Sequence, residues 1–532
     1  MGSEMCIRDS FQDFETPLEV PPFEQIQTDH YLPAFEAGIE QHKHEIEAIV
    51  SSKDPATFEN TIEALEYSGG LLRKVSRVFF NLNSAMTNDE MQTIAKKVAP
   101  MLAKHQDDIL LDPALFSRVA TVYEQLDKLD LTPEGKMLLE ETYRDFVRGG
   151  AKLDESGKSE LRKINEELSV LSVRFGENVL KENNAFEMVI ESEEDLEGLP
   201  DSVIAAAAEA ARDREYRGKW LFTLDKPSLI PFLQFSSRRD LREKMLKGYI
   251  TRGDHGNEFD NNEIAIRIAE LRARRAALLG YTSHADYVLE KAMAKEPEAV
   301  YELLNRVWEP ARAVAVKEAA ALQELIKREG GDFKLQPWDW WYFAEKIRKE
   351  KYDLDEEQLR PYFQLENVRN GAFEVAKRLY GLTFEERTDL PVYHQDVKTF
   401  EVKEADGSHV GILYVDYFPR PSKRGGAWMN SFRKHAVMDG QRLTPVISNV
   451  CNFSKPVGDR PALLSLEEVR TLFHEFGHAL HGLLSKCVYD SQSGTAVPRD
   501  FVELPSQIMA VSYTHLRAHE TSLHLVCRLL LE

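Results

Sequence analysis

Two histidines and a glutamate stand together in residues 474–478, which read HEFGH. His474 and His478 are four positions apart, so on an α-helix they lie on the same face, one turn from each other. Two imidazoles in this arrangement can both reach one tetrahedral zinc ion at about 2.0–2.1 Å. Glu475 follows the first histidine directly, where its carboxylate can reach water on the metal rather than the metal itself. The spacing therefore predicts a catalytic zinc site with its own general base.

The segment around this motif is predicted to be a buried helix over residues 464–485. Ser465 and Glu468 have the spacing of a capping box at its start. The following residues are apolar on nearly every side, which indicates burial. Two histidines and a glutamate are costly to bury unless a ligand or a partner satisfies them. A pair of core histidines bonded to other side chains is the alternative, and the buried context favours the metal.

A catalytic zinc ion usually takes three protein ligands and keeps one position open. Glu503 follows His478 by 25 residues, after a loop rich in turn-forming residues. Pro498 and Asp500 are start signals for a second helix, and we expect Asp500 to cap it. Glu503 would then lie on the first turn, within reach of the metal. The spacing alone equally allows a solvated carboxylate that the helix dipole favours.

The motif and its surroundings resemble the thimet oligopeptidase and peptidyl-dipeptidase family of zinc metallopeptidases. Besides 474–478, the segments that carry the resemblance are 335–342 (LQPWDWWY), 351–355 (KYDLD), 359–363 (LRPYF), 423–429 (KRGGAWM), 449–456 (NVCNFSKP), 493–495 (SGT) and 500–507 (DFVELPSQ). The resemblance extends over about residues 11–509 and is strongest to the bacterial peptidyl-dipeptidase branch.

The resemblance implies the fold, the site and the reaction. It implies one zinc ion per chain, bound by His474, His478 and Glu503, with Glu475 as the catalytic base. The fold would be mainly α-helical and two-lobed, with a small β-sheet next to the zinc-binding helix and a deep substrate channel. The substrates would be short oligopeptides, from which the enzyme releases C-terminal dipeptides. An endo-acting oligopeptidase of the same family and a non-catalytic peptide-binding protein are the alternatives.

The two ends of the chain do not fit the resemblance. Residues 1–10 and 510–532 look like translated adapter DNA, so we expect no metal ligands at His515, His519 or His524. The family continues beyond the third ligand with groups that bind substrate and stabilise the oxyanion. We therefore expect a C-terminally truncated chain that is itself inactive or poorly folded, although its full-length parent is an enzyme. The substrate-binding residues stay unassigned.

Helical periodicity dominates the rest of the chain. We expect an N-terminal helical region over 11–150 and a second region over 151–509 that contains the sheet and the incomplete catalytic core. Apolar spacing predicts the following helices: 23–51, 57–98, 113–127, 132–148, 156–184, 262–279 and 297–328. Residues 397–402 and 410–415 alternate around a turn and predict a hairpin, and 446–453 predict another strand. Either 446–453 or 425–428 could offer its backbone to an extended substrate.

Composition restricts the partners and the compartment. The net charge is 67 − 89 = −22, which argues against a nucleic-acid partner. No apolar run approaches the roughly 18 residues that a membrane-spanning helix needs. Of the four cysteines, Cys6 and Cys527 lie in the ends that do not fit the resemblance, and the remaining Cys451 and Cys487 are too few for a disulfide framework. We expect a monomer in the cytoplasm, with the periplasm as the alternative because the native N-terminus looks lost.

Overall fold

The computed structural model describes residues 14–352, 358–438, 440–458 and 460–515. Residues 1–10, His519 and His524, on which expectations were placed above, lie outside these described residues. The described chain is mainly α-helical and contains three small sheets, which confirms the predicted fold class.

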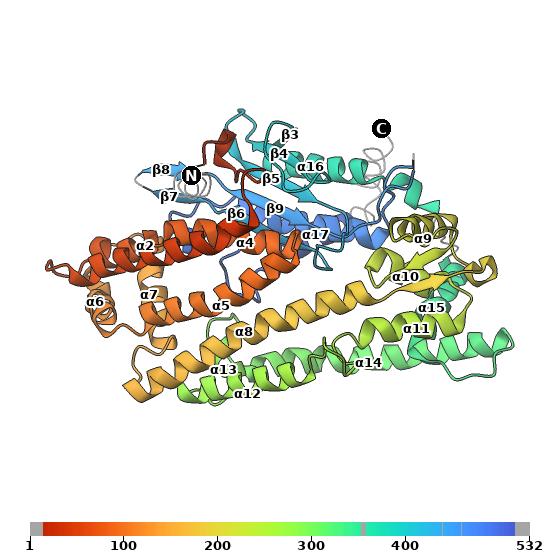
Figure 1. Cartoon of the computed structure of the whole chain (residues 1–532), viewed down its shortest axis with the longest axis horizontal. Coiled ribbons are helices and arrows are strands. Elements are labelled where there is room, and N and C mark those ends of the chain that lie inside the picture. Colours follow the sequence, from red (N-terminus) through yellow and green to blue (C-terminus); the bar gives the residue numbers. More distant parts are fainter. Residues whose placement is uncertain (1–13, 353–357, 439, 459, 516–532) are drawn as a thin grey trace.

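The helices form two main layers (Figure 1). In the first half of the chain they are α2 (Tyr31–Ser51), α3 (Ala64–Tyr67), α4 (Gly70–Ala85), α5 (Asp89–Leu110), α6 (Pro113–Tyr123), α7 (Pro133–Arg148), α8 (Glu155–Ala185), α9 (Asp201–Asp213), α10 (Lys226–Phe235) and α11 (Arg239–Ile250). They continue with α12 (Asn262–Leu278), α13 (His284–Leu289), α14 (Pro297–Arg328), α15 (Pro337–Tyr352), α16 (Leu365–Tyr380), α17 (Leu466–Leu483) and α18 (Glu503–His515). In Figure 1, α2, α4 and α17 lie on the side of the main sheet, α12 and α14 lie on the opposite side, and α8 runs between them.

Most predicted helices are present close to their expected bounds. Helix α14 has the predicted bounds, and α7 begins after Thr132, whose side chain accepts the N–H of Gly135. The single helix expected over 57–98 is wrong, because it is broken into α3, α4 and α5. Gly69, before α4, has φ +69°, and a Cβ atom there would lie 2.7 Å from Nδ1 of His42. Only glycine fits this turn without strain or a clash.

The main sheet has the strand order β3-β4-β5-β9-β6. Its strands are β3 (Thr383–Glu386), β4 (Lys398–Lys403), β5 (His409–Asp416), β9 (Val446–Val450) and β6 (Trp428–Arg433). The β4–β5 hairpin is antiparallel, as predicted, and pairs Phe400 with Leu413. Strand β9 runs parallel to β5 and antiparallel to β6, so both of its edges are paired. The suggestion that 446–453 offers a free edge to substrate is therefore wrong, and β6 is the edge strand on this side.

Two further sheets have two strands each. Strand β1 (Met188–Ile190) pairs with β2 (Trp220–Phe222), and β7 (Ala436–Met438) pairs with β8 (Gln441–Leu443), both antiparallel. None of these four strands carries a predicted site residue.

Helices cover both faces of the main sheet. Leu413 and Val415 of β5 belong to a core that contains apolar residues of α16 and α17. Ile412 and Tyr414, the alternate residues, belong to a second core shared with α2, α4 and α5. This alternation explains why β5 is buried almost throughout. The division at residue 150 stays a prediction, and the N-terminal helices share a core with the sheet across it.

Helix α14 differs from the others in its exposure. Every residue from 301 to 318 is exposed, and only its last turns pack against α15. Among the described residues, no helix combines the length and the apolar character that crossing a bilayer requires.

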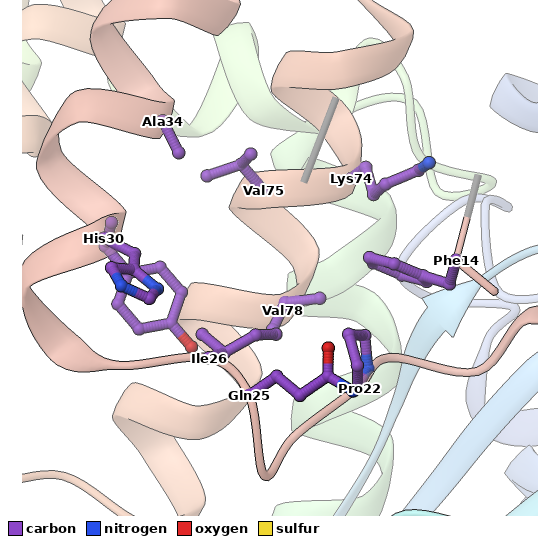
Figure 2. Close-up of a pocket in the computed structure, with 10 residues that line it drawn as sticks. Phe14, Pro22, Gln25, Ile26, His30, Ala34, Lys74, Val75 and Val78 are labelled. Atoms are coloured by element: carbon purple, nitrogen blue, oxygen red, sulfur yellow. The ribbon is translucent and has the colours of Figure 1, made fainter. Parts of the chain in front are cut away.

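A small cavity of about 60 Å³ lies between residues 14–26 and helices α2 and α4 (Figure 2). Its walls are mainly apolar, with Val75 and Val78 of α4 on one side, and the Tyr31 ring also lines it. None of the four predicted site residues lines this cavity.

Candidate metal centre

Helix α17 carries the HEFGH motif and is fixed at its start by the predicted capping box. The Ser465 hydroxyl accepts the N–H of Glu468, and the Glu468 carboxylate accepts the N–H of Ser465 at 2.7 Å. Farther along, a Cβ atom on Gly482 would lie 2.8 Å from Cδ1 of Ile447 in β9, so α17 packs closely on the sheet. The motif therefore lies on a buried helix that is capped at its start and packed closely against the sheet.

The structure brings the three predicted metal ligands together. Nε2 of His474 lies 3.2 Å from Oε2 of Glu503, and Nε2 of His478 lies 3.3 Å from the same oxygen. One ligand atom from each of the three residues lies within 4.8 Å of the others. The imidazole rings are nearly perpendicular, at 86°. In the described part of the chain, this is the only group of three or more such side chains close enough to share a metal ion.

These distances suit a tetrahedral zinc ion. Two ligand atoms at about 2.0–2.1 Å from such an ion lie about 3.3 Å apart. The two nitrogen-to-oxygen distances, 3.2 and 3.3 Å, agree with this spacing. Two imidazoles and one carboxylate are also the donor types that zinc prefers, and they leave a fourth position open.

Helix α18 reaches the motif because Gly477 lies between the two histidines. A Cβ atom on Gly477 would lie 2.7 Å from the carbonyl oxygen of Pro505, 2.7 Å from Cα of Ser506 and 3.1 Å from Cβ of Met509. Glycine therefore allows the two helices to approach until the Glu503 carboxylate faces both imidazoles. This role of Gly477 was not predicted from the sequence, although a glycine inside an otherwise strong helix is a signal for close packing.

Ser506 orients the Glu503 carboxylate. Its hydroxyl lies 2.8 Å from Oε2 of Glu503 and 2.8 Å from the Glu503 carbonyl oxygen, and its side chain is fully buried. This hydroxyl is in hydrogen-bonding distance of the oxygen that faces the histidines. No local pattern in the sequence singled out Ser506.

Glu475 is 6% exposed, and its Oε2 has no hydrogen-bond partner among the described residues. Its carbonyl oxygen accepts a bond of 2.8 Å from Nδ2 of Asn449 in β9, which ties the motif to the sheet. Burial, and next the negative charge of Glu503, raise the pKa of Glu475 to about 8. In the described structure, one carboxylate oxygen of Glu475 is therefore free, on the same helix that carries the two histidines.

Asp500 does not have the expected role. Its Oδ1 accepts the N–H of Met293 and its Oδ2 accepts the N–H of Ala294, each at 2.9 Å. Helix α18 begins at Glu503, and the cap expected from Asp500 is wrong because both of its oxygens bind a different segment. The partners are more than 200 residues earlier in the chain, so no local pattern could indicate them.

Taken with the mainly helical fold, this arrangement is typical of the class of metallopeptidases in which one helix carries two histidines and a neighbouring glutamate. The model of the family described as Peptidase family M3 matches residues 232–522, more than half of the chain. The chain belongs to this family, which confirms the resemblance found in the sequence.

Curated relatives agree with this assignment. The chain is 42% identical over 500 residues to "Dipeptidyl carboxypeptidase" of Escherichia coli (strain K12), covering 94% of this chain and 73% of that protein. It is 41% identical to "Dipeptidyl carboxypeptidase" of Salmonella typhimurium, covering 95% and 74%. It is 35% identical to "Oligopeptidase A" of Escherichia coli, covering 93% and 73%. The protein is therefore a metallopeptidase that hydrolyses peptides. The family match runs to residue 522, and the assignment of 510–532 as non-native sequence stays a prediction.

Proposed function

We propose that this protein is a zinc peptidase that releases dipeptides from the C-terminus of short peptides. His474, His478 and Glu503 would hold the zinc ion, and Glu475 would act as the base. The observation that carries the proposal is the position of Oε2 of Glu503, which lies 3.2 and 3.3 Å from the two imidazole nitrogens.

The chemistry follows from the side chains. A zinc ion bound there would supply Lewis acidity, which polarises the scissile carbonyl and acidifies water. The positive charge of a bound zinc ion would lower the raised pKa of Glu475 and favour its carboxylate form. Glu475 then accepts a proton from the attacking water at Oε2, which has no partner among the described residues, and passes that proton to the departing amine. The burial of Glu475 keeps bulk water from competing for this oxygen.

An extended substrate can pair with the edge of the main sheet. Strand β6 is that edge, and its other side pairs with β9, which lies against α17. The Ser431 carbonyl oxygen is already bonded by Nδ2 of Asn81 at 3.0 Å. We therefore propose that the substrate backbone pairs with the start of β6, near Trp428. Trp428 is the last residue of the segment 425–428 that was predicted to offer its backbone.

Release of C-terminal dipeptides is supported by the relatives named dipeptidyl carboxypeptidase in Escherichia coli and Salmonella typhimurium. The test compares a short peptide that has a free C-terminal carboxylate with the same peptide amidated at that end. Dipeptide release from the free peptide alone, abolished by a chelator and restored by zinc, is the expected result. Equal internal cleavage of both peptides would overturn the dipeptidase assignment.

Endo-acting cleavage is the second candidate, because the chain is also 35% identical to an oligopeptidase A. Internal cleavage of the amidated peptide would favour it. A chain that binds peptide and zinc without any turnover would instead be the non-catalytic peptide-binding protein.

We further infer a monomer in the cytoplasm, with the periplasm as the alternative compartment. The two cysteines in the described part of the chain, Cys451 and Cys487, are both free, which suits a reducing compartment. Cell fractionation tests the compartment. Light scattering over a range of concentrations tests the monomer, which a concentration-dependent mass would contradict.

A further inference from the structure

Glu503, the proposed third ligand, differs from the two histidines in its exposure to solvent and in its place at the start of a helix. His474 and His478 project from a buried helix, whereas Glu503 is the first residue of α18 and its side chain is 55% exposed. Burial of its own side chain therefore cannot fix where Glu503 points. Its position depends on what holds the turn just before it.

Asp500 holds that turn against another part of the molecule. Its two carboxylate oxygens accept the consecutive N–H groups of Met293 and Ala294, 2.9 Å each. A carboxylate that uses both oxygens on neighbouring backbone donors makes charge-assisted bonds and fixes orientation as well as distance. Lys295, the next residue, has φ +65°, an uncommon value for a residue other than glycine, so the chain makes a defined turn here.

This turn, residues 291–296, is itself anchored. Nζ of Lys291 lies 2.6 Å from Oδ1 of Asp145 and 3.0 Å from Oε2 of Glu141, both in α7. Just before it, Glu290 forms an ion pair with Arg148 at the end of the same helix. The Asp500 carboxylate is therefore bound to a segment that α7 holds in place, rather than to a free loop.

The short path from Asp500 to Glu503 transmits this anchoring. The N–H groups of Phe501 and Val502 both bond to the carbonyl oxygen of Pro498, at 2.9 and 3.1 Å, which closes the turn between the two acidic residues. On the other side of Glu503, Ser506 contacts its carboxylate. Glu503 is thus held from both sides along the chain, three residues away in each direction.

We propose that Asp500 is a positioning residue for the metal site: it fixes the opening turn of α18 to the 291–296 turn, so that the Glu503 carboxylate stays facing both imidazoles. This role rests on the proposed function, because it requires Glu503 to be a zinc ligand. Asp500 itself touches neither histidine in the described structure, and it acts through the backbone. The helical region that contains α7 thereby takes part in setting zinc affinity.

The test measures the zinc dissociation constant of the full chain by competition with a chromophoric chelator. Asp500→Ala is expected to weaken zinc binding about 10–100-fold, as loss of groups that orient a ligand does. Replacing zinc with cobalt(II) gives a second readout, and the absorption bands of the cobalt form should shift in the variant because the ligand geometry changes. If Asp500→Ala does not fold, Asp500→Asn, which keeps one acceptor oxygen, gives the same test in milder form.

Asp260→Ala is the matched control. Asp260 also accepts one backbone N–H on each oxygen, from Gly256 and Asn262 at 2.8 Å, and none of its bonds reaches the metal-site helices. It should lose thermal stability to a similar degree with an unchanged zinc dissociation constant and cobalt spectrum. Equal zinc affinity in Asp500→Ala and the unmutated chain would overturn the proposal.

Two further variants, Lys291→Ala and Glu503→Ala, distinguish a failure of the positioning role of Asp500 from a failure of the proposed ligand set. Lys291→Ala releases the 291–296 turn from α7, so combined with Asp500→Ala it should add little to the loss of zinc affinity. If the losses of zinc affinity in the two single variants add fully in the double variant, Asp500 and Lys291 do not act through the same turn. If Glu503→Ala leaves zinc binding unchanged, the ligand set of the proposed function fails. If Glu503→Ala weakens binding and Asp500→Ala does not, only the positioning role fails.

Discussion

The contact between the two metal-site helices can be tested at Gly477. In Gly477→Ala, the new Cβ atom would lie 2.7 Å from the Pro505 carbonyl oxygen and 2.7 Å from Cα of Ser506. Both are backbone atoms, so no side-chain rotation relieves the clash. Restoring an ordinary contact of about 3.5 Å requires α18 to move by somewhat less than about 1 Å.

That displacement is large for a metal site. Ligand distances in a working site hold to about ±0.2 Å, and Glu503 lies two residues before Pro505 on the helix that must move. We expect zinc affinity to fall about 10–100-fold. Stability changes less, because overpacking costs about 1–3 kcal/mol while alanine gains up to about 1 kcal/mol over glycine inside a helix.

The assay is a zinc titration against a competing chelator, together with thermal unfolding of the zinc-free protein. Gly176→Ala is the control, since Gly176 lies inside α8, is exposed, and no atom of the described residues lies within 4 Å of the added Cβ. The control should gain about 1 kcal/mol in free energy of unfolding and bind zinc like the unmutated chain. If Gly477→Ala binds zinc as tightly as the unmutated chain, the glycine does not set the distance between α17 and α18.

Three more predictions follow from named side chains. In a form of the protein that turns over peptides, Glu475→Gln should keep about one zinc per chain, measured by elemental analysis, and lose turnover about 10²–10⁴-fold in a peptide assay; undiminished turnover would remove Glu475 from the role of base. Burial raises the pKa of Asp107 to about 6, above its unfolded value of about 3.8, so its protonation stabilises the fold at low pH and this stability is lost as the pH rises through 6. Asp107→Asn should therefore raise unfolding free energy by about 2–3 kcal/mol at pH 8, with a gain that shrinks toward pH 4 in urea titrations; a constant gain would contradict this. Leu304 and Trp308 are 54% and 61% exposed on α14, and the double variant Leu304→Glu with Trp308→Glu should lower binding of the dye ANS, whose unchanged fluorescence would show that this face does not take up apolar molecules.

The elements that could be predicted from the sequence alone are those with local causes. The bounds of α14 and the capping box of α17 depend on residues within one or two turns, and the pairing of β4 with β5 depends on alternation around one short turn. The four-residue spacing of His474 and His478 needs only a helix to place both rings on one face. The family followed from these same local motifs.

Other features depended on segments that meet only in the folded chain. Strand β9 reads as a strand in the sequence, yet its central place comes from pairing with β5 and β6, so no local pattern could show that its edges are occupied. The break before α4 depends on His42, which leaves no room for a side chain at Gly69. Periodicity reports which residues are apolar, and it does not report which segment covers them.

The candidate site divides in the same way. The sequence placed two imidazoles and Glu475 on one helix, whereas spacing alone left Glu503 undecided between a ligand and a solvated carboxylate. The location of Glu503 became clear only in the folded chain, because the approach of α18 depends on the absence of a side chain at Gly477 and on the bonds that the N–H groups of Met293 and Ala294 donate to Asp500. A helix carries its own internal geometry in its sequence, but the distance between two helices is set by the atoms that meet at their contact.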